Sequence, residues 1–178
     1  MCVIRKNNDT IAHNVNKLKN KKLNAQSSYA TLSKWITGDY DILEKNDTII
    51  AIPKNIKALL EFQHNNIHII KELGIELGTI KGKKIVPSHQ LALSQNLASG
   101  AFPEINVDYH TAIAYLRGEA ITVDAPRGYI LIKYDNAILG FANNLGNRAN
   151  NLYPKPWRIM STHIPSTPVT IFGKSTNL

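Results

Sequence analysis

Residues 128–158 read GYILIKYDNAILGFANNLGNRANNLYPKPWR, and this stretch decides how the rest of the chain is interpreted. Residues 129–134 and 137–142 are mostly apolar and β-forming. Asp135-Asn136 between them suits a type I′ turn, because both residues tolerate positive φ. The sequence therefore predicts a β-hairpin. The polar segment after it combines amide, cationic and aromatic side chains, which favours binding of a polar polymer over a reaction centre.

The polar segment contains the side-chain types that proteins use on RNA. Asparagine can donate and accept hydrogen bonds at base edges and the 2′-OH, cations hold phosphates, and aromatic rings stack on unpaired bases. Asparagines also satisfy turns, and Tyr153 and Trp157 also fit core positions, which we favour for both rings; whether they stack or are core stays open. The predicted RNA-binding residues are Asn143, Asn144, Asn147, Arg148, Asn150, Asn151, Tyr153, Lys155 and Arg158.

The composition is that of a globular protein. The chain has 178 residues, of which 43% are apolar and 19% charged. No apolar run approaches the roughly 20 residues that span a bilayer, so no membrane association is expected. The single cysteine, Cys2, excludes an internal disulfide framework and a zinc site made of several cysteines, which points to the cytoplasm.

The net charge of +8 is unevenly distributed. Residues 1–34 carry +6 and residues 129–178 carry +4, whereas residues 35–128 carry −2. A polyanion such as RNA would be attracted to the two basic parts and would release counterions on binding. The alternative is that the high pI serves only solubility.

The pattern of apolar residues and turn signals predicts an α+β fold in two small modules. Residues 1–28 form a short β-like start and a basic linker with the run KLKNKK at 17–22. In the first module, residues 29–98, we expect helices at 29–36, 53–63 and 89–97 and β-like pieces at 41–43, 48–52, 67–73, 75–80 and 84–86. In the second, residues 104–178, we expect a helix at 109–117 capped by Asp108, the hairpin, and short strands at 121–123, 157–160 and 169–172.

Enzymatic motifs are missing from the sequence. It has no dinucleotide-binding glycine pattern, no P-loop and no nucleophile elbow. The six histidines are scattered without a metal-binding context. We therefore predict no catalytic residue and no metal site.

Three stretches resemble one family in the family's own order. The residues LG (139–140), GNR (146–148) and NNLYPK (150–155) are similar to the signature of the PUA-like RNA-binding domain that ends bacterial NOL/NOP/Sun-type (RsmF-like) cytosine-5 ribosomal RNA methyltransferases. PSHQLAL (87–93) and AIAYLRGE (112–119), followed by GYILIKYD (128–135), resemble two further motifs of that family. The resemblance covers roughly residues 29–160 and implies a PUA-like, partly closed β-barrel with short helices in the second module.

The sequence also departs from the family. Residues 141–144 (FANN) lack the basic residues common there, and the glycine loop for S-adenosylmethionine and both active-site cysteines are missing. Residues 1–6 (MCVIRK) resemble the end of the catalytic domain. The resemblance implies a C-terminal region that positions ribosomal RNA for an upstream methyltransferase domain. It implies no activity and no cofactor for this chain, with S-adenosylmethionine only in the missing domain.

Two other functions are compatible with the sequence. The chain could be a protein-interaction module that packs on and stabilises the catalytic domain, or a small hydrolase or nuclease, which no group of residues encourages. Salt dependence separates RNA binding from packing, because phosphate contacts make the affinity fall as salt rises.

Overall fold

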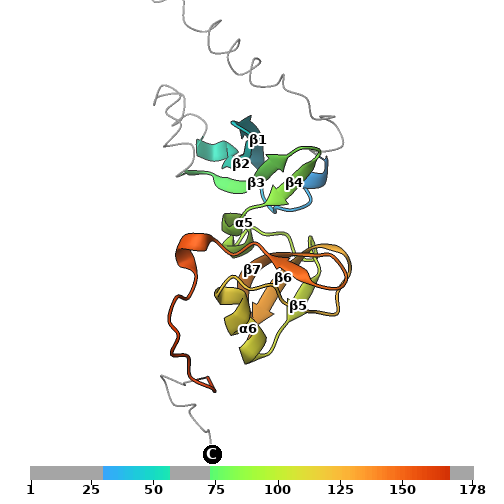
Figure 1. The fold of residues 1–178 in the computed structure, drawn as a ribbon. Coiled ribbons are helices and arrows are strands. Elements are labelled where there is room, and N and C mark those ends of the chain that lie inside the picture. The colour runs from blue at the N-terminus through green and yellow to red at the C-terminus, as the bar shows by residue number, and fades with distance from the viewer. Residues whose placement is uncertain (1–29, 57–72, 169–178) are drawn as a thin grey trace, which may run out of the picture. The chain divides into compact units, whose positions relative to one another are not determined.

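The computed structural model describes residues 30–56 and 73–168 (Figure 1). The chain divides into two compact units, Met1–Ala101 and Phe102–Leu178. Each contains one four-stranded sheet and short helices, so the expected α+β class is confirmed. The predicted β-like start, the basic linker, the closing strand at 169–172, and most of the helix at 53–63 and of the strand at 67–73 lie outside the described residues.

The first unit is built on an antiparallel sheet. Its order is β1-β2-β3-β4, formed by β1 (Tyr40–Lys45), β2 (Thr48–Pro53), β3 (Ile75–Lys81) and β4 (Lys84–Pro87). A 3-10 turn, η1 (Lys54–Ile56), follows β2. The segment before the sheet is helical at 30–32, shorter than the predicted helix at 29–36, and continues in turns at 33–35. It buries Leu32, Trp35 and Ile36, as the sequence predicts.

The helix after β4 is shorter than predicted. Helix α5 spans His89–Leu93, whereas the sequence predicts a helix to residue 97. Ser88 caps its start by accepting a hydrogen bond from the N–H of Leu91 at 3.1 Å. Leu97 instead forms a β-bridge with Ile36, and the C=O of Asn96 accepts from the N–H of Thr37 at 2.7 Å. These tertiary pairings require extended backbone, so the helix ends early.

The second unit is organised around the predicted hairpin. β6 (Gly128–Tyr134) and β7 (Ala137–Asn144) are antiparallel, and Asp135 and Asn136 both have positive φ, 48° and 65°, as a type I′ turn requires. β5 (Glu104–Asn106) joins β6 in parallel and β8 (Ala149–Asn151) joins β7, which gives the order β5-β6-β7-β8. Within residues 102–168 no pairing of β5 with β8 closes the sheet, so the partly closed barrel is not confirmed.

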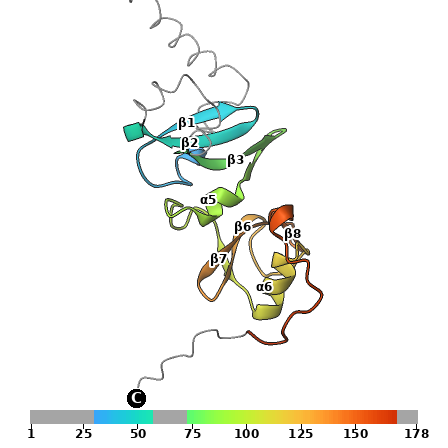
Figure 2. The same ribbon diagram turned by 90° about the vertical axis from the view of Figure 1, so that its left-hand side faces the viewer.

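Helix α6 (Tyr109–Leu116) covers one face of this sheet (Figures 1 and 2). Tyr115 is fully buried against Ile130, Ile132 and Ala142, and its hydroxyl donates to the C=O of Phe141 at 2.9 Å. Burial raises the pKa of Tyr115, with a smaller contribution from Tyr153, so the hydroxyl remains a donor. The core of the second unit therefore fixes α6 directly over β6 and β7.

Two predictions about this unit are wrong, and two of its strands were not predicted. Residues 121–123 form only a single bridge, between Ile121 and Ala149, instead of a strand. Residues 155–157 form a 3-10 turn, η2 (Lys155–Trp157), and 158–160 are not a strand. Neither β5 nor β8 was predicted, because both are three residues long and polar. Among the described residues no helix is long and apolar enough to cross a membrane.

The N-cap of α6 makes a pH dependence predictable. Asp108 accepts hydrogen bonds from the N–H and the hydroxyl of Thr111, at 2.9 and 2.8 Å, and these bonds lower the pKa of its carboxyl below 3.8. A lowered folded-state pKa contributes stability that is present above the unfolded value and is lost as the pH falls through the folded one. Asp108→Asn keeps a capping side chain and removes the titration. Thermal unfolding should therefore depend less on pH below 3.8 in D108N than in the parent; equal slopes would contradict this.

Candidate nucleic-acid interface

Strand β8 holds the polar segment at the edge of the second sheet. It pairs with β7 on one side, and on the other Ile121 exchanges two backbone hydrogen bonds with Ala149, at 3.2 and 2.7 Å. Residues 119–127 continue alongside β8, because Asn151 binds the backbone of Glu119 and Asn144 that of Ala125. This returning segment brings residue 127 to the turn between β7 and β8.

Two arginines meet at the β7–β8 turn. The turn is closed by a hydrogen bond from the N–H of Leu145 to the C=O of Arg148, at 2.9 Å, and Gly146 has a φ of 102°. A Cβ at Gly146 would lie 3.0 Å from the Nε of Arg127, so the guanidinium of Arg127 rests on the turn. Asn147, Arg148 and Arg127 are all exposed. Two cations and an amide are thus presented on one turn.

Asn144 is part of the scaffold. It is 2% exposed, and its amide N–H groups donate to the C=O of Ala125 at 2.7 Å and of Pro126 at 3.2 Å. Its Oδ1 accepts from the N–H of Gly146 at 3.0 Å. This side chain has no exposed polar atom to offer a nucleic acid, so we move it from the predicted interface to its support.

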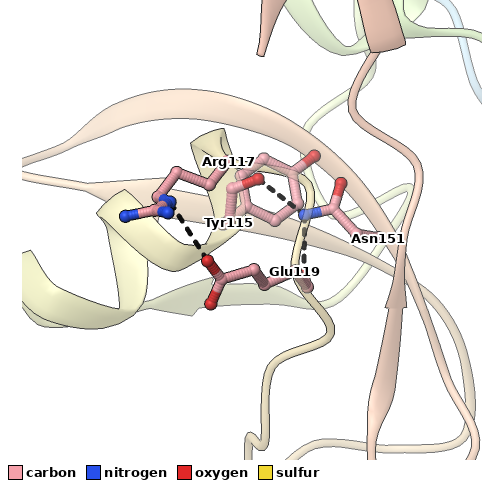
Figure 3. A network of polar contacts seen from close by, with 4 residues as sticks. All are labelled: Tyr115, Arg117, Glu119 and Asn151. Carbon is pink, nitrogen blue, oxygen red and sulfur yellow. Dashed lines mark hydrogen bonds and ion pairs between the residues drawn. The ribbon is translucent and has the colours of Figure 1, made fainter. Parts of the chain in front are cut away.

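Asn151 has the same kind of role at the other end of β8 (Figure 3). Its amide donates to the C=O of Tyr115 at 2.6 Å and of Glu119 at 3.0 Å, and its Oδ1 accepts from the N–H of Tyr153 at 2.7 Å. Beside it, Arg117 and Glu119 form an ion pair at 3.1 Å. Asn151 therefore ties β8 to the C-terminal end of α6.

Asn143 and Asn150 face away from these two. They are directly opposite each other in the β7–β8 ladder, and Tyr129 of β6 is opposite Asn143. All three side chains are half-buried. Strand alternation separates the asparagines into a scaffold pair and a pair on the opposite face of the sheet.

The 3-10 turn η2 places a second set of cations near the end of α6. Lys155 is exposed at its start. The guanidinium of Arg158 lies on Gly118, where a Cβ would overlap its Nε and Cζ, and the N–H of Ile159 donates to the C=O of Leu116 at 3.1 Å. A cation at a helix C-terminus is favoured by the helix dipole. Arg158 is thus held in place by packing, while Lys155 projects freely into solvent.

The two aromatic residues of this segment differ. Tyr153 packs edge-on against Tyr115, with ring centroids 5.6 Å apart, and borders the core, as expected for a core residue. Trp157 is 58% exposed, so its expected core position is wrong. The sequence also predicts a strand at 157–160, whereas Pro154 and Pro156 favour the 3-10 turn η2, on which the indole is exposed.

Charges are separated along the second unit. The end with the β7–β8 turn, β8 and η2 carries Arg127, Arg148, Lys155 and Arg158, none of which forms an ion pair within the described residues. The same end also carries the Arg117–Glu119 ion pair and the exposed Asp124, so its charge is positive overall. The hairpin turn and the start of α6 lie at the opposite end, because Val107 hydrogen-bonds to Lys133. That end carries Asp108 and Asp135. We call the first of these the basic end.

The region with the basic end was compared with known proteins. Residues 102–159 match the methyltransferase RsmF PUA domain. The match includes α6, all four strands of the second sheet and η2, and it confirms the family resemblance noted in the sequence. We refer to residues 102–159 as the PUA-like unit.

A curated relative matches a longer part of the chain. Over 128 residues the chain is 27% identical to the ribosomal RNA small subunit methyltransferase F of Shewanella loihica. The match covers 67% of this chain and 24% of that protein, so the chain spans about a quarter of its relative's length. The similarity thus extends beyond the PUA-like unit.

The structure adds one residue to the predicted interface. Arg127 lies far in sequence from the asparagine-rich segment, and only its position directly before the hairpin hinted at a role. Among residues 30–56 and 73–168, no group of three His, Cys, Asp or Glu side chains could hold a metal ion. The basic end presents amide, cationic and aromatic side chains.

Proposed function

We propose that the PUA-like unit binds RNA and positions a ribosomal RNA for a methyltransferase domain of a longer protein. The observation that carries this is the separation of charge: four cations that form no ion pair with any described residue gather at the basic end, in the region matched to the RsmF PUA domain. The Shewanella relative is named a ribosomal RNA methyltransferase, which supports ribosomal RNA as the class of target.

Each group at the basic end has a distinct role in this proposal. Arg127, Arg148 and Lys155 contact phosphates, since charge-assisted hydrogen bonds to phosphate position a nucleic acid without reading its sequence. Asn147 beside them contacts a sugar or base edge. Asn144 holds the β7–β8 turn in place, and Asn151 holds β8 against the end of α6. The methyl transfer, and S-adenosylmethionine with it, belongs to the methyltransferase domain, and the protein acts in the cytoplasm.

Replacing Arg127 and Arg148 together by glutamine tests the proposal. A hydrogen bond to a charged group contributes about 1.5–3 kcal/mol, and 1.4 kcal/mol is a factor of ten, so affinity should fall at least roughly tenfold. For single strands each lost phosphate contact should reduce the slope of log K against log salt by about 0.7. Fluorescence anisotropy with a labelled single-stranded RNA across a salt series measures both.

The matched control is Lys81→Gln with Lys83→Gln. Of these two exposed lysines, Lys81 ends β3 and Lys83 lies in the β3–β4 turn of the first unit, so the control removes the same charge elsewhere in the same chain. Its affinity should stay near the parent's. Equal RNA binding by R127Q/R148Q and the parent would remove the proposed interface and favour the alternative, a module that packs on the methyltransferase domain.

A further inference from the structure

Trp157 is the most unusual exposed side chain of the basic end. Tryptophan is highly buried on average in folded proteins, yet Trp157 is 58% exposed. Trp35, the other tryptophan of the chain, is 9% exposed. Leaving apolar ring surface in contact with water costs hydrophobic free energy, and a ligand that covers the exposed part of the ring would recover it.

The backbone under Trp157 is held firmly. Pro156 fixes a φ angle within η2 and Pro154 fixes that of its N-cap, and the N–H of Trp157 donates to the C=O of Pro154 at 3.0 Å. Two residues later, Ile159 is hydrogen-bonded to the end of α6 at 3.1 Å. The backbone that carries the indole is therefore fixed before any ligand arrives, which lowers the entropy cost of binding.

The cationic side chains next to Trp157 indicate which class of ligand its exposed ring would bind. Exposed Lys155 precedes it by two residues and Arg158 follows it directly. Cations beside an exposed aromatic ring are the combination that single-stranded nucleic-acid sites use, with phosphates on the cations and bases stacked on the ring. An apolar protein partner would have to desolvate these cations without compensation, which is costly.

Resting on the proposed function, we propose that Trp157 is a stacking platform for an unpaired base of the bound RNA. Lys155 holds the adjacent phosphate, and Arg127 and Arg148 hold the strand further along, beyond β8. The PUA-like unit would therefore prefer single-stranded or looped RNA to a continuous duplex, whose bases are already stacked on one another.

Two variants separate stacking from other contacts. Trp157→Leu keeps an apolar side chain without a π face, and Trp157→Phe keeps a smaller π face. Because the side chain is exposed, neither should impair folding, which circular dichroism verifies. For a single-stranded RNA, W157L should bind about tenfold more weakly, with an unchanged salt slope, and W157F should recover most of the loss. Affinity for the same sequence as a duplex should be equal in parent and W157L.

Tryptophan fluorescence gives a second readout. Stacking should quench the emission of Trp157 when single-stranded RNA is added to the parent, while the buried Trp35 gives a constant background that W157F isolates. If the parent binds RNA by anisotropy but W157L binds equally well, or if no quenching accompanies binding, the stacking platform is refuted and the proposed function stands. If the parent binds no RNA at all, the proposed function itself fails.

Discussion

Replacing Asn151 by alanine is expected to destabilise the PUA-like unit by about 3 kcal/mol. Its side chain makes three hydrogen bonds, two to the C=O groups of Tyr115 and Glu119 and one from the N–H of Tyr153. Each contributes about 1 kcal/mol, and the partners left half-buried and unpaired add to the cost. Urea unfolding followed by far-UV circular dichroism measures the change.

Asn150→Ala is the matched control for this experiment. The residue is the preceding one of the same strand and of the same type, but its side chain faces the other side of the sheet. Asn150 makes no side-chain hydrogen bond with any described residue, so its replacement should change the stability by no more than about 0.5 kcal/mol. Similar losses for N150A and N151A would show that the network in Figure 3 does not hold β8 to α6.

Replacing Gly118 by alanine is expected to cost at least about 2 kcal/mol. Gly118 has a φ of 84°, and an L-residue in this left-handed region costs about 1–2 kcal/mol. The glycine completes a Schellman motif, because its N–H donates to the C=O of Tyr115 at 2.9 Å and that of Glu119 to the C=O of Ala114 at 3.0 Å. The new Cβ would also displace the guanidinium of Arg158.

A double-mutant cycle separates the two causes. In an Arg158→Ala background the collision is absent, so Gly118→Ala should cost only the backbone strain. We expect a coupling of about 1 kcal/mol between the two sites in thermal unfolding. Additive effects would mean that Arg158 can leave Gly118 without loss.

The sequence predicted correctly the elements that are determined by neighbouring residues. The hairpin follows from the alternation of apolar residues around Asp135-Asn136, and the cap of α6 from Asp108. The misses have tertiary causes. The segment after Leu93 leaves the helix because Leu97 pairs with Ile36, which lies far away in sequence. β8 is polar and short, and it exists because β7 and Ile121 provide partners on both sides.

The sequence placed the candidate site at residues 143–158, and three of the four cations of the basic end, Arg148, Lys155 and Arg158, belong to that segment. That these residues bind RNA stays a prediction. Residue type could not distinguish Asn150 from Asn151, because the difference lies in which face of β8 each occupies. Arg127 was missed because the fold brings the returning segment to Gly146, a proximity that no short sequence motif encodes.

The returning segment along β8 has a consequence for the solubility of this unit. An unpaired strand edge is a template for pairing between molecules, and β8 would offer such an edge next to the buried Ala149. Ile121 occupies the middle of this edge and Asn151 ties down its end. Deletions between residues 119 and 127 would therefore expose the edge of β8 and cause self-association even while the β6–β7 hairpin stays folded. Engineered versions of the protein should leave this segment intact.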